Sequence, residues 1–179
     1  MYEFGDGRLY WMFDCPMGYH QVEVNARSQP KLAFAGPNAR LYTWRVMPFG
    51  PVNGPTIFIN LMLDINQEWQ QLAISKGISI DEDTNTKLIV DDVFNHAKGE
   101  SNAFLYMESQ LYIAARRRLS ISLPKSSFFP DRVEFVGVDV GIDSNMPAKS
   151  KHELLRKWPK PVDIRAVASF ICFGMWYQK

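Results

Sequence analysis

The chain has 179 residues, of which 46% are hydrophobic and 22% are charged. This balance is typical of a globular protein with a substantial core, and it excludes a disordered tail. The 20 basic and 19 acidic residues give a net charge of +1, so any affinity for nucleic acid has to come from the distribution of charge along the chain.

The cysteine content and the hydropathy of the chain indicate the cellular compartment in which the protein is expected. Only Cys15 and Cys172 are present, without CxxC or Cys/His spacing, which argues against a disulfide scaffold and against a zinc site. No apolar run approaches the roughly 20 residues of a membrane span, and residues 1–10 lack the basic and then apolar order of a signal peptide. We therefore expect an intracellular protein with no membrane contact. Because the chain begins near a strand and ends on a helix, without tails, we also expect a segment of a longer protein.

Short strands dominate the first part of the predicted fold. Residues 8–13 form an aromatic, mostly apolar run that suits a buried strand and places Asp14 at its end. Alternation and turn residues predict three more short strands, over residues 20–25, 31–35 and 41–47. Residues 48–56 are too rich in proline and glycine for regular structure. An amphipathic helix is predicted to follow them as far as Leu72.

The second part of the predicted fold contains a hairpin, a helix and a strand, in that order. A polar loop over residues 75–86 precedes two apolar runs that read as a hairpin with Asp91 and Asp92 at its tip. A helix is predicted over residues 101–119, and a strand over 132–140 in which Gly137 marks a bulge or a close backbone approach. Beyond residue 149 the chain turns basic, and Asp163 is a candidate N-cap for a last helix. This order predicts an α+β fold with a domain boundary near residue 147.

The carboxylates at strand ends are the candidate functional groups. An α+β fold can bring Asp14 together with Asp91 and Asp92, and three converging carboxylates repel each other unless divalent cations neutralise them. Mg²⁺ prefers such oxygen ligands, and two ions held in this way support phosphoryl transfer. An Asp-Asp pair at a hairpin tip is, by itself, more often a solvated turn. The carboxylates alone leave both interpretations open.

The motifs around these carboxylates occur in a fixed order. They are FDCPMGYHQV at residues 13–22, KLAF at 31–34, VMPFGPVNGPTIF at 46–58, IVDDV at 89–93, LSISLPKSSFF at 119–129, VEFVG at 133–137, KWPKP at 157–161 and SFICFGMWY at 169–177. In this order, and with VMPFG as the most specific element, nearly the whole chain resembles the reverse transcriptases (RNA-dependent DNA polymerases) of gypsy-class LTR retrotransposons, which are similar to retroviral enzymes. The resemblance implies a palm, an antiparallel sheet backed by helices, with partial fingers over residues 1–148. The start of a thumb follows over residues 149–179.

The resemblance also implies roles for the carboxylates and their neighbours. By the family's motifs, Asp14, Asp91 and Asp92 are the catalytic, metal-binding triad, holding Mg²⁺ with Mn²⁺ able to substitute. The carbonyl of Cys15 is an extra oxygen ligand in the nucleotide site. Lys125 is placed to protonate the leaving pyrophosphate, although a solvated surface lysine is the alternative.

The remaining implied roles concern the nucleotide and the primer. Tyr19 is expected to lie under the incoming sugar and to exclude a 2′-hydroxyl, while Phe49 and Gly50 line the nucleotide pocket. The primer-grip hairpin is expected to contain Phe135, Val136 and Gly137. For the aromatic residues among these, the alternative is an ordinary place in the core.

The sequence departs from the family at several positions. Ile89 replaces the tyrosine of the Tyr-x-Asp-Asp hairpin, Pro51 and Gly54 alter the segment after VMPFG, and Ser126 stands where cysteine is frequent. None of these changes removes a carboxylate. We assign no chemistry to His20 or Gln21.

The expected activity is RNA-directed DNA polymerisation, in which a primer 3′-hydroxyl attacks a deoxynucleoside triphosphate. The implied partners are an RNA or DNA template with its primer, a dNTP, and a longer polyprotein carrying ribonuclease H and integrase. The expected location is cytoplasmic, in a virus-like particle, or nuclear. The alternatives are a catalytically inactive or domesticated nucleic-acid-binding fragment and, with less support, a metal-dependent phosphohydrolase.

Overall fold

The computed structural model describes residues 8–141 and 145–176, and these fall into two compact units. One unit is Arg8–Pro130, and the other comprises Met1–Gly7 and Asp131–Lys179. The division by contacts lies near residue 130, which does not test a functional boundary between palm and thumb at residue 148, so that boundary stays a prediction.

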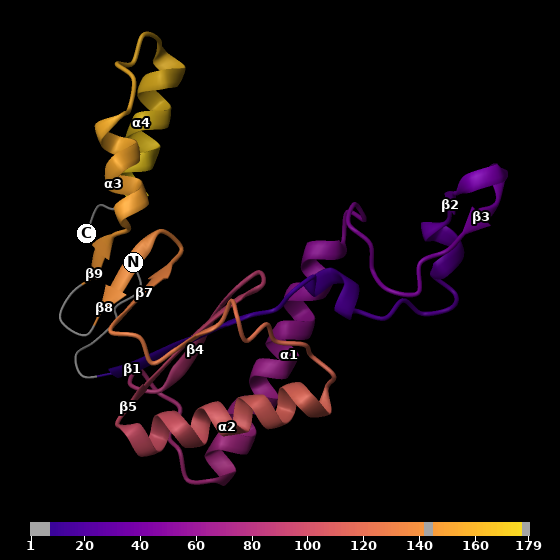
Figure 1. Ribbon diagram of the computed structural model, residues 1–179, viewed down its shortest axis with the longest axis horizontal. Helices are drawn as coiled ribbons and strands as arrows, with labels where there is room; N and C mark the ends of the chain where they lie inside the picture. The colour runs from indigo at the N-terminus through magenta and orange to yellow at the C-terminus, as the bar shows by residue number, and fades with distance from the viewer. Residues whose placement is uncertain (1–7, 142–144, 177–179) are drawn as a thin grey trace. The chain divides into compact units, whose positions relative to one another are not determined.

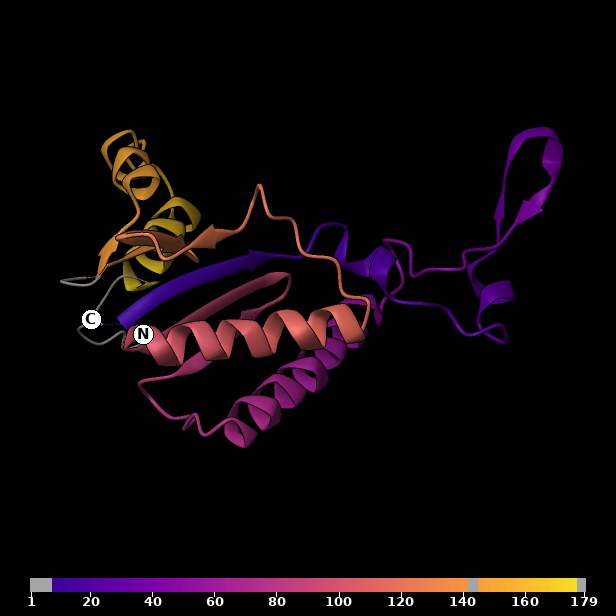
Figure 2. The ribbon, with the colours of Figure 1, turned by 60° about the horizontal axis from the view of Figure 1, so that its bottom comes forward.

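The unit Arg8–Pro130 is built on a four-stranded antiparallel sheet (Figure 1). In spatial order its strands are β4 (Asn85–Ile89), β5 (Asp92–Lys98), β1 (Arg8–Asp14) and β6 (Ser127–Phe128). Two helices, α1 (Gly54–Ser75) and α2 (Glu100–Arg116), pack against each other and cover one face of this sheet (Figure 2). An antiparallel sheet backed by helices confirms the predicted α+β class.

Helix α1 follows from its sequence at both ends and along its buried face. Pro55 occupies the first turn, where its missing N–H costs no hydrogen bond. Gly77, with φ of +87°, ends the helix in a Schellman arrangement, since the N–H of Ile78 donates to the carbonyl of Ala73. The buried residues recur at helical spacing and are Gly54, Phe58, Met62, Ile65, Trp69 and Ala73.

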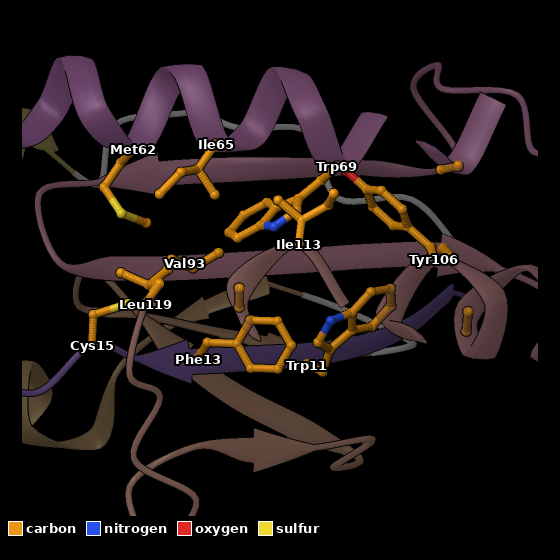
Figure 3. Packing of buried hydrophobic residues seen from close by; sticks show 14 of the residues in the cluster. Trp11, Phe13, Cys15, Met62, Ile65, Trp69, Val93, Tyr106, Ile113 and Leu119 are labelled. Atoms are coloured by element: carbon orange, nitrogen blue, oxygen red, sulfur yellow. The ribbon is translucent and has the colours of Figure 1, made fainter. Parts of the chain in front are cut away.

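The core lies between the sheet and the two helices (Figure 3). Alternate residues of β1 point into it, so Trp11 and Phe13 are fully buried against helical residues such as Trp69 and Tyr106. Trp11 and Tyr106 meet edge to face, with ring centroids 5.9 Å apart. The end of β1 is thereby fixed, and the residue that follows Phe13 is turned toward the opposite face.

A buried polar network joins α2 to three strands of the sheet. The side chain of Gln110 donates to Thr86 Oγ1 at 2.9 Å and to Asn95 Oδ1 at 2.6 Å, and it accepts from the indole of Trp11 at 2.8 Å. Thr86 in turn donates to Asn95 at 2.7 Å and contacts the hydroxyl of Tyr106 at 2.8 Å. Burial raises the pKa of Tyr106 to about 12, so this hydroxyl stays neutral. The predicted loop over 75–86 is therefore wrong at its end, because Thr86 lies inside a strand.

Residues 18–47 contain less strand than the sequence predicts. The structure has β2 (Phe34–Ala35) and β3 (Leu41–Tyr42), which pair into a separate two-stranded sheet (Figure 1). Three short 3₁₀ helices replace the remaining predicted strand, namely η1 (Gly18–Gln21), η2 (Gln29–Leu32) and η3 (Pro37–Ala39). The strand predicted over 20–25 is reduced to one antiparallel bridge between Glu23 and Val46.

The second unit contains a three-stranded antiparallel sheet and two helices. Its elements are β7 (Arg132–Phe135), β8 (Val138–Gly141), β9 (Asn145–Pro147), α3 (Lys149–Arg156) and α4 (Ile164–Trp176). The single strand predicted over 132–140 is wrong: Val136 and Gly137, with φ of +51° and +76°, form a two-residue hairpin turn between β7 and β8. Asp163 caps α4 as predicted, since its Oδ1 accepts from the N–H of Ala166 at 2.7 Å. No helix in the described part of the chain is long and apolar enough to cross a membrane.

Candidate active site

Strand pairing brings two of the three predicted carboxylates face to face. In the antiparallel register of β1 and β5, Asp14 lies directly opposite Asp92. Side chains alternate along a strand, so both carboxylates belong to the face opposite the one that buries Phe13 and Val93. Like charges placed directly across two strands are destabilising, so this pair costs the sheet stability.

The third carboxylate lies in the turn that joins β4 to β5. Asp91 follows Val90 in a two-residue connection between the paired residues Ile89 and Asp92. Val90 has φ of +55°, which a β-branched residue rarely adopts. Strain of this kind costs on the order of 1–3 kcal/mol and clusters at functional sites. The tip that presents Asp91 therefore carries a conformational cost that the rest of the hairpin has to offset.

The electrostatics of the site follow from this crowding. Partial burial, together with the charges of Asp91 and Asp14, raises the pKa of the Asp92 carboxyl above its usual value. Burial, reinforced by the three carboxylates, raises the pKa of the Cys15 thiol to about 12. A site that disfavours added negative charge in this way favours a bound cation.

A turn at residues 122–126 supports Asp14 from a distant part of the chain. The N–H of Asp14 donates to Ser126 Oγ at 3.1 Å, and the carbonyl of Asp14 accepts from the N–H of Ser122 at 2.9 Å. The same turn places the ammonium of Lys125 3.9 Å from Asp14 Oδ2. Lys125 is well exposed, so this ion pair contributes little stability.

The carboxylates suit a divalent cation in chemistry, although their present arrangement does not enclose one. Asp14 Oδ2 is buried without a hydrogen-bond partner among the described residues, as expected of an atom that serves a ligand. Carboxylate oxygens are the ligands that Mg²⁺ prefers. Within residues 8–141 and 145–176, however, no three His, Cys, Asp or Glu side chains are placed to hold a metal ion as they stand. Cation binding would therefore need the carboxylates to converge further.

The predicted nucleotide-pocket residues meet beside helix α1. The rings of Tyr19 and Phe49 have centroids 5.1 Å apart, and Tyr19 also packs edge to face on Phe58 at 5.7 Å. Gly18 allows this approach, because a Cβ there would lie 2.6 Å from the ring of Phe58. Phe49 is 68% exposed, so it is a surface residue and the core alternative does not apply to it. Gly50 has φ of +111°, a conformation that favours glycine.

The predicted primer-grip residues belong to the other unit. Phe135 ends β7 and is buried, and Val136 and Gly137 form the turn that follows it. They form a hairpin tip, as the resemblance implies. Their role stays a prediction.

Two residues without an assigned chemical role support the site. The side-chain amide of Gln21 donates to the carbonyls of Pro16 and Ser120 at 2.8 and 3.2 Å and accepts from the N–H of Ser120 at 2.7 Å. It thereby ties the segment after Asp14 to the segment that follows α2. Ser126 supports Asp14 itself. Nothing in the spacing of a single sequence indicates either contact, because both partners are distant along the chain.

The two cysteines are expected to differ sharply in reactivity. Cys15 is 3% exposed and has a raised pKa, whereas Cys172 is exposed. Because the thiolate is the reactive form, a thiol reagent at pH 8 should label Cys172 quickly and Cys15 only after denaturation. Counting labelled thiols by mass spectrometry in native and denatured protein tests this, with Cys172→Ser as the control. Rapid native labelling of Cys15 in that variant would contradict the burial described above.

Comparison with known proteins shows the family to which the chain is similar. Residues 5–140 match the reverse transcriptase (RNA-dependent DNA polymerase) family. The chain is 25% identical, over 98% of its length, to the retrovirus-related Pol polyprotein from transposon opus of Drosophila melanogaster, of which it covers 16%. It is also 25% identical, over 97% of its length, to the Pol polyprotein from transposon gypsy of the same organism, again covering 16%. The chain therefore spans only about a sixth of these relatives.

Solved structures show the same fold at lower identity. The chain matches the foamy viral protease-reverse transcriptase in complex with double-stranded DNA with a TM-score of 0.77 and 16% identity, covering 97% of this chain and 28% of that one. A second structure, of the foamy viral enzyme with an RNA/DNA hybrid, matches with a TM-score of 0.70 and 18% identity, covering 94% and 21%. Because the family match extends over most of the chain and the fold agrees with it, this chain belongs to the reverse transcriptase (RNA-dependent DNA polymerase) family.

Proposed function

We propose that this chain is the palm of an RNA-directed DNA polymerase of a gypsy-like retrotransposon, which transfers a nucleotide from a dNTP to a primer 3′-hydroxyl. The observation that carries the proposal is the placement of Asp14 opposite Asp92, with Asp91 beside it at a strained tip. A carboxylate pair that destabilises the sheet is accounted for by a function that needs it. The family match supplies the class of reaction.

The carboxylates would hold two Mg²⁺ ions, with Mn²⁺ able to substitute. When bound, such ions lower the pKa of the attacking hydroxyl and stabilise the charge that develops on the phosphate. Asp14, Asp91 and Asp92 would be the ligands, and the buried Oδ2 of Asp14 is the ligand atom with no competing hydrogen bond among the described residues. Lys125 stands near Asp14, where an ammonium can deliver a proton to the departing pyrophosphate.

The aromatic residues Tyr19 and Phe49 would select the nucleotide. Tyr19 is only partly buried and lies five residues beyond Asp14, where its ring can clash with a 2′-hydroxyl. Phe49 packs on this ring and remains largely exposed, so it can line the pocket together with Gly50. The proposed partners are a template with its primer, a dNTP, and the longer polyprotein in which the relatives of this domain occur.

Primer extension tests the proposal directly. With poly(rA) template and oligo(dT) primer, the chain is expected to incorporate dTTP in Mg²⁺ or Mn²⁺ and to stop in EDTA. The Asp91→Asn, Asp92→Asn double variant is the blank for contaminating polymerases. Extension by both proteins at the same rate would show that the activity does not depend on these carboxylates and would refute the proposal.

A catalytically inactive or domesticated nucleic-acid-binding fragment is the second candidate. Two observations favour it: Ile89 stands at the family's tyrosine, and no described group of three acidic, His or Cys side chains is arranged to hold a metal as it stands. This candidate predicts binding of primer and template without turnover in either metal. The retained carboxylates oppose it, because a binding module gains nothing from opposing like charges.

A further inference from the structure

A basic segment with a serine follows helix α2, and its sequence is RRRLSI at residues 116–121. Arg117 and Arg118 stand three and two residues before Ser120, and the apolar Ile121 follows it. Serine/threonine kinases that select basic substrates recognise this combination. Carboxylates in their substrate cleft pair with the two guanidinium groups, and an apolar pocket receives the residue after the serine. The combination occurs at no other serine or threonine of the chain.

The serine and the arginines of this segment are accessible. Ser120 and all three arginines are exposed, and Ser120 lies in irregular backbone beyond the last turn of α2. Within residues 8–141 and 145–176, no group hydrogen-bonds to the Ser120 hydroxyl and no carboxylate pairs with Arg118. Arg117 lies 3.7 Å from Glu68, an exposed pair that contributes little. The groups that a kinase would recognise can therefore reach a second protein.

The end of α2 is strained at one of the two recognition arginines. The N–H of Leu119 donates to the carbonyl of Ala114 at 2.8 Å, which places Arg118 where a Schellman end normally has glycine. Arg118 accordingly has φ of +57°, a conformation that side chains with a Cβ disfavour. Opening of the segment relieves this strain, so the helix end favours its own release.

Two contacts hold the segment closed. The side chain of Gln21 accepts from the N–H of Ser120 at 2.7 Å and donates to the carbonyl of Ser120 at 3.2 Å. Leu119 is buried in the core. A kinase binds the residues around its target serine in an extended conformation, so the backbone of Ser120 has to be released by local opening first. The contact with Gln21 therefore limits how often the serine is available.

We propose that Ser120 is a phosphorylation site for a kinase that selects basic substrates, with Arg117 and Arg118 as its recognition residues and Gln21 as the latch that restricts access. In this reaction the hydroxyl oxygen of Ser120 forms a bond to the γ-phosphorus of ATP. The bond between that phosphorus and ADP breaks, and the hydroxyl proton passes to a base of the kinase. The product carries about −1.5 to −2 charges on Ser120 at neutral pH.

The added charge lies close to the candidate active site. Ser122, two residues beyond Ser120, donates its N–H to the carbonyl of Asp14 at 2.9 Å. Gln21 joins Ser120 to the carbonyl of Pro16, which it contacts at 2.8 Å. The effect of the phosphate rests on the proposed function, in which this site receives a polyanionic primer and template. Binding of that duplex should weaken by about threefold or more at low salt, and the difference should shrink as KCl screens the charges.

Phosphorylation of the full chain tests the site itself. The chain is incubated with Mg-ATP and the catalytic subunit of cAMP-dependent protein kinase, and mass spectrometry counts and maps the phosphate. One phosphate is expected on Ser120, and Ser120→Ala should prevent it. In Arg117→Gln, Arg118→Gln the initial rate should fall about 100-fold or more, since each charged hydrogen bond contributes about tenfold or more. In Gln21→Ala the rate should rise about threefold or more, because two bonds to the Ser120 backbone are lost.

Matched controls separate this result from general charge effects and from the proposed reaction. Arg40→Gln, Arg45→Gln removes the same charge at two exposed positions and should be phosphorylated at the wild-type rate. Asp91→Asn, Asp92→Asn should also be phosphorylated at the wild-type rate, so the modification can be scored even if the chain never extends a primer. Anisotropy of labelled primer and template in EDTA compares phosphorylated and unmodified chain, with kinase-treated Ser120→Ala as the reference.

Three outcomes would overturn the proposal. One is the absence of phosphate on Ser120 in both the wild type and Gln21→Ala. Another is a phosphorylation rate that Arg117→Gln, Arg118→Gln leaves unchanged, which would remove the arginines from recognition. The last is a phosphorylated chain that binds primer and template as tightly as the unmodified chain at every salt concentration, which would remove the effect on the candidate site.

Discussion

Asp14→Asn is expected to lower the rate of primer extension by about 10²–10³-fold or more while leaving the fold intact. Asparagine preserves the size of the side chain and the backbone hydrogen bonds from Asp14 to Ser126 and Ser122. What it removes is the negative charge of the buried oxygen that has no hydrogen-bond partner among the described residues. If that oxygen is a cation ligand, the charge is needed in the transition state and not in the folded protein.

Single-turnover extension at saturating dNTP measures this loss, and circular dichroism checks the fold. Asp64→Asn is the matched control, because Asp64 is an exposed carboxylate on α1 whose removal should leave the rate unchanged. A second readout is independent of turnover: Mg²⁺ should raise the melting temperature of the wild type and have a much smaller effect on Asp14→Asn. Extension by Asp14→Asn at the wild-type rate would exclude Asp14 from the metal site.

The parts of the fold that sequence predicts well are those set by local patterns. Apolar residues at helical spacing define α1, and the hydrophobic run ending at Asp14 defines β1, because both elements bury one continuous set of side chains. The hairpin carrying Asp91 and Asp92 is predictable for the same reason, since apolar runs flank the pair. These elements suffice to predict the α+β class.

A pattern of alternating apolar and polar residues predicts a strand wrongly where the chain is irregular. Val22 and Val24 alternate with polar residues as in a strand, yet they pack on the core from a 3₁₀ turn and one isolated bridge. Thr86 is polar and follows an acidic, polar run, so the sequence predicts a loop there. The structure buries it in a strand, because its partner Gln110 cannot be inferred from neighbouring residues. Likewise, Gly137 signals a special backbone conformation without saying whether it is a bulge or a turn.

The candidate site also has features that the sequence predicts and features that it does not. The carboxylates are predictable from motifs, whereas the pairing of Asp14 with Asp92 depends on strand register between distant segments. The contacts of Ser126 and Gln21 depend on a turn whose position only tertiary packing determines. Residue types can therefore be proposed from sequence, but the groups that hold them in place cannot.

Gln110→Ala is expected to lower the free energy of unfolding by about 2–5 kcal/mol, the largest stability effect that we predict. The side chain is fully buried and makes three hydrogen bonds, to Trp11, Thr86 and Asn95. Truncation leaves the Trp11 indole N–H without its acceptor in a dry core, and it also opens a cavity. Urea denaturation measures the change, and Gln71→Ala, at an exposed position of α1, should stay within about 0.5 kcal/mol of wild type.

A double-mutant cycle with Trp11→Phe tests whether the cost arises from the network. If the orphaned indole N–H dominates, the double variant should be less destabilised than the sum of the single variants, because both members of one hydrogen bond are then absent. Strict additivity would mean that cavity formation alone explains Gln110→Ala.

Gln110 joins α2 to β1, β4 and β5, and β1 and β5 carry the opposed carboxylates Asp14 and Asp92. The network therefore offsets the repulsion between these carboxylates at the ends of the same strands. Neutralising Asp92 should therefore partly restore the stability of Gln110→Ala, and a failure of Asp92→Asn to do so would show that the opposed carboxylates do not destabilise the sheet.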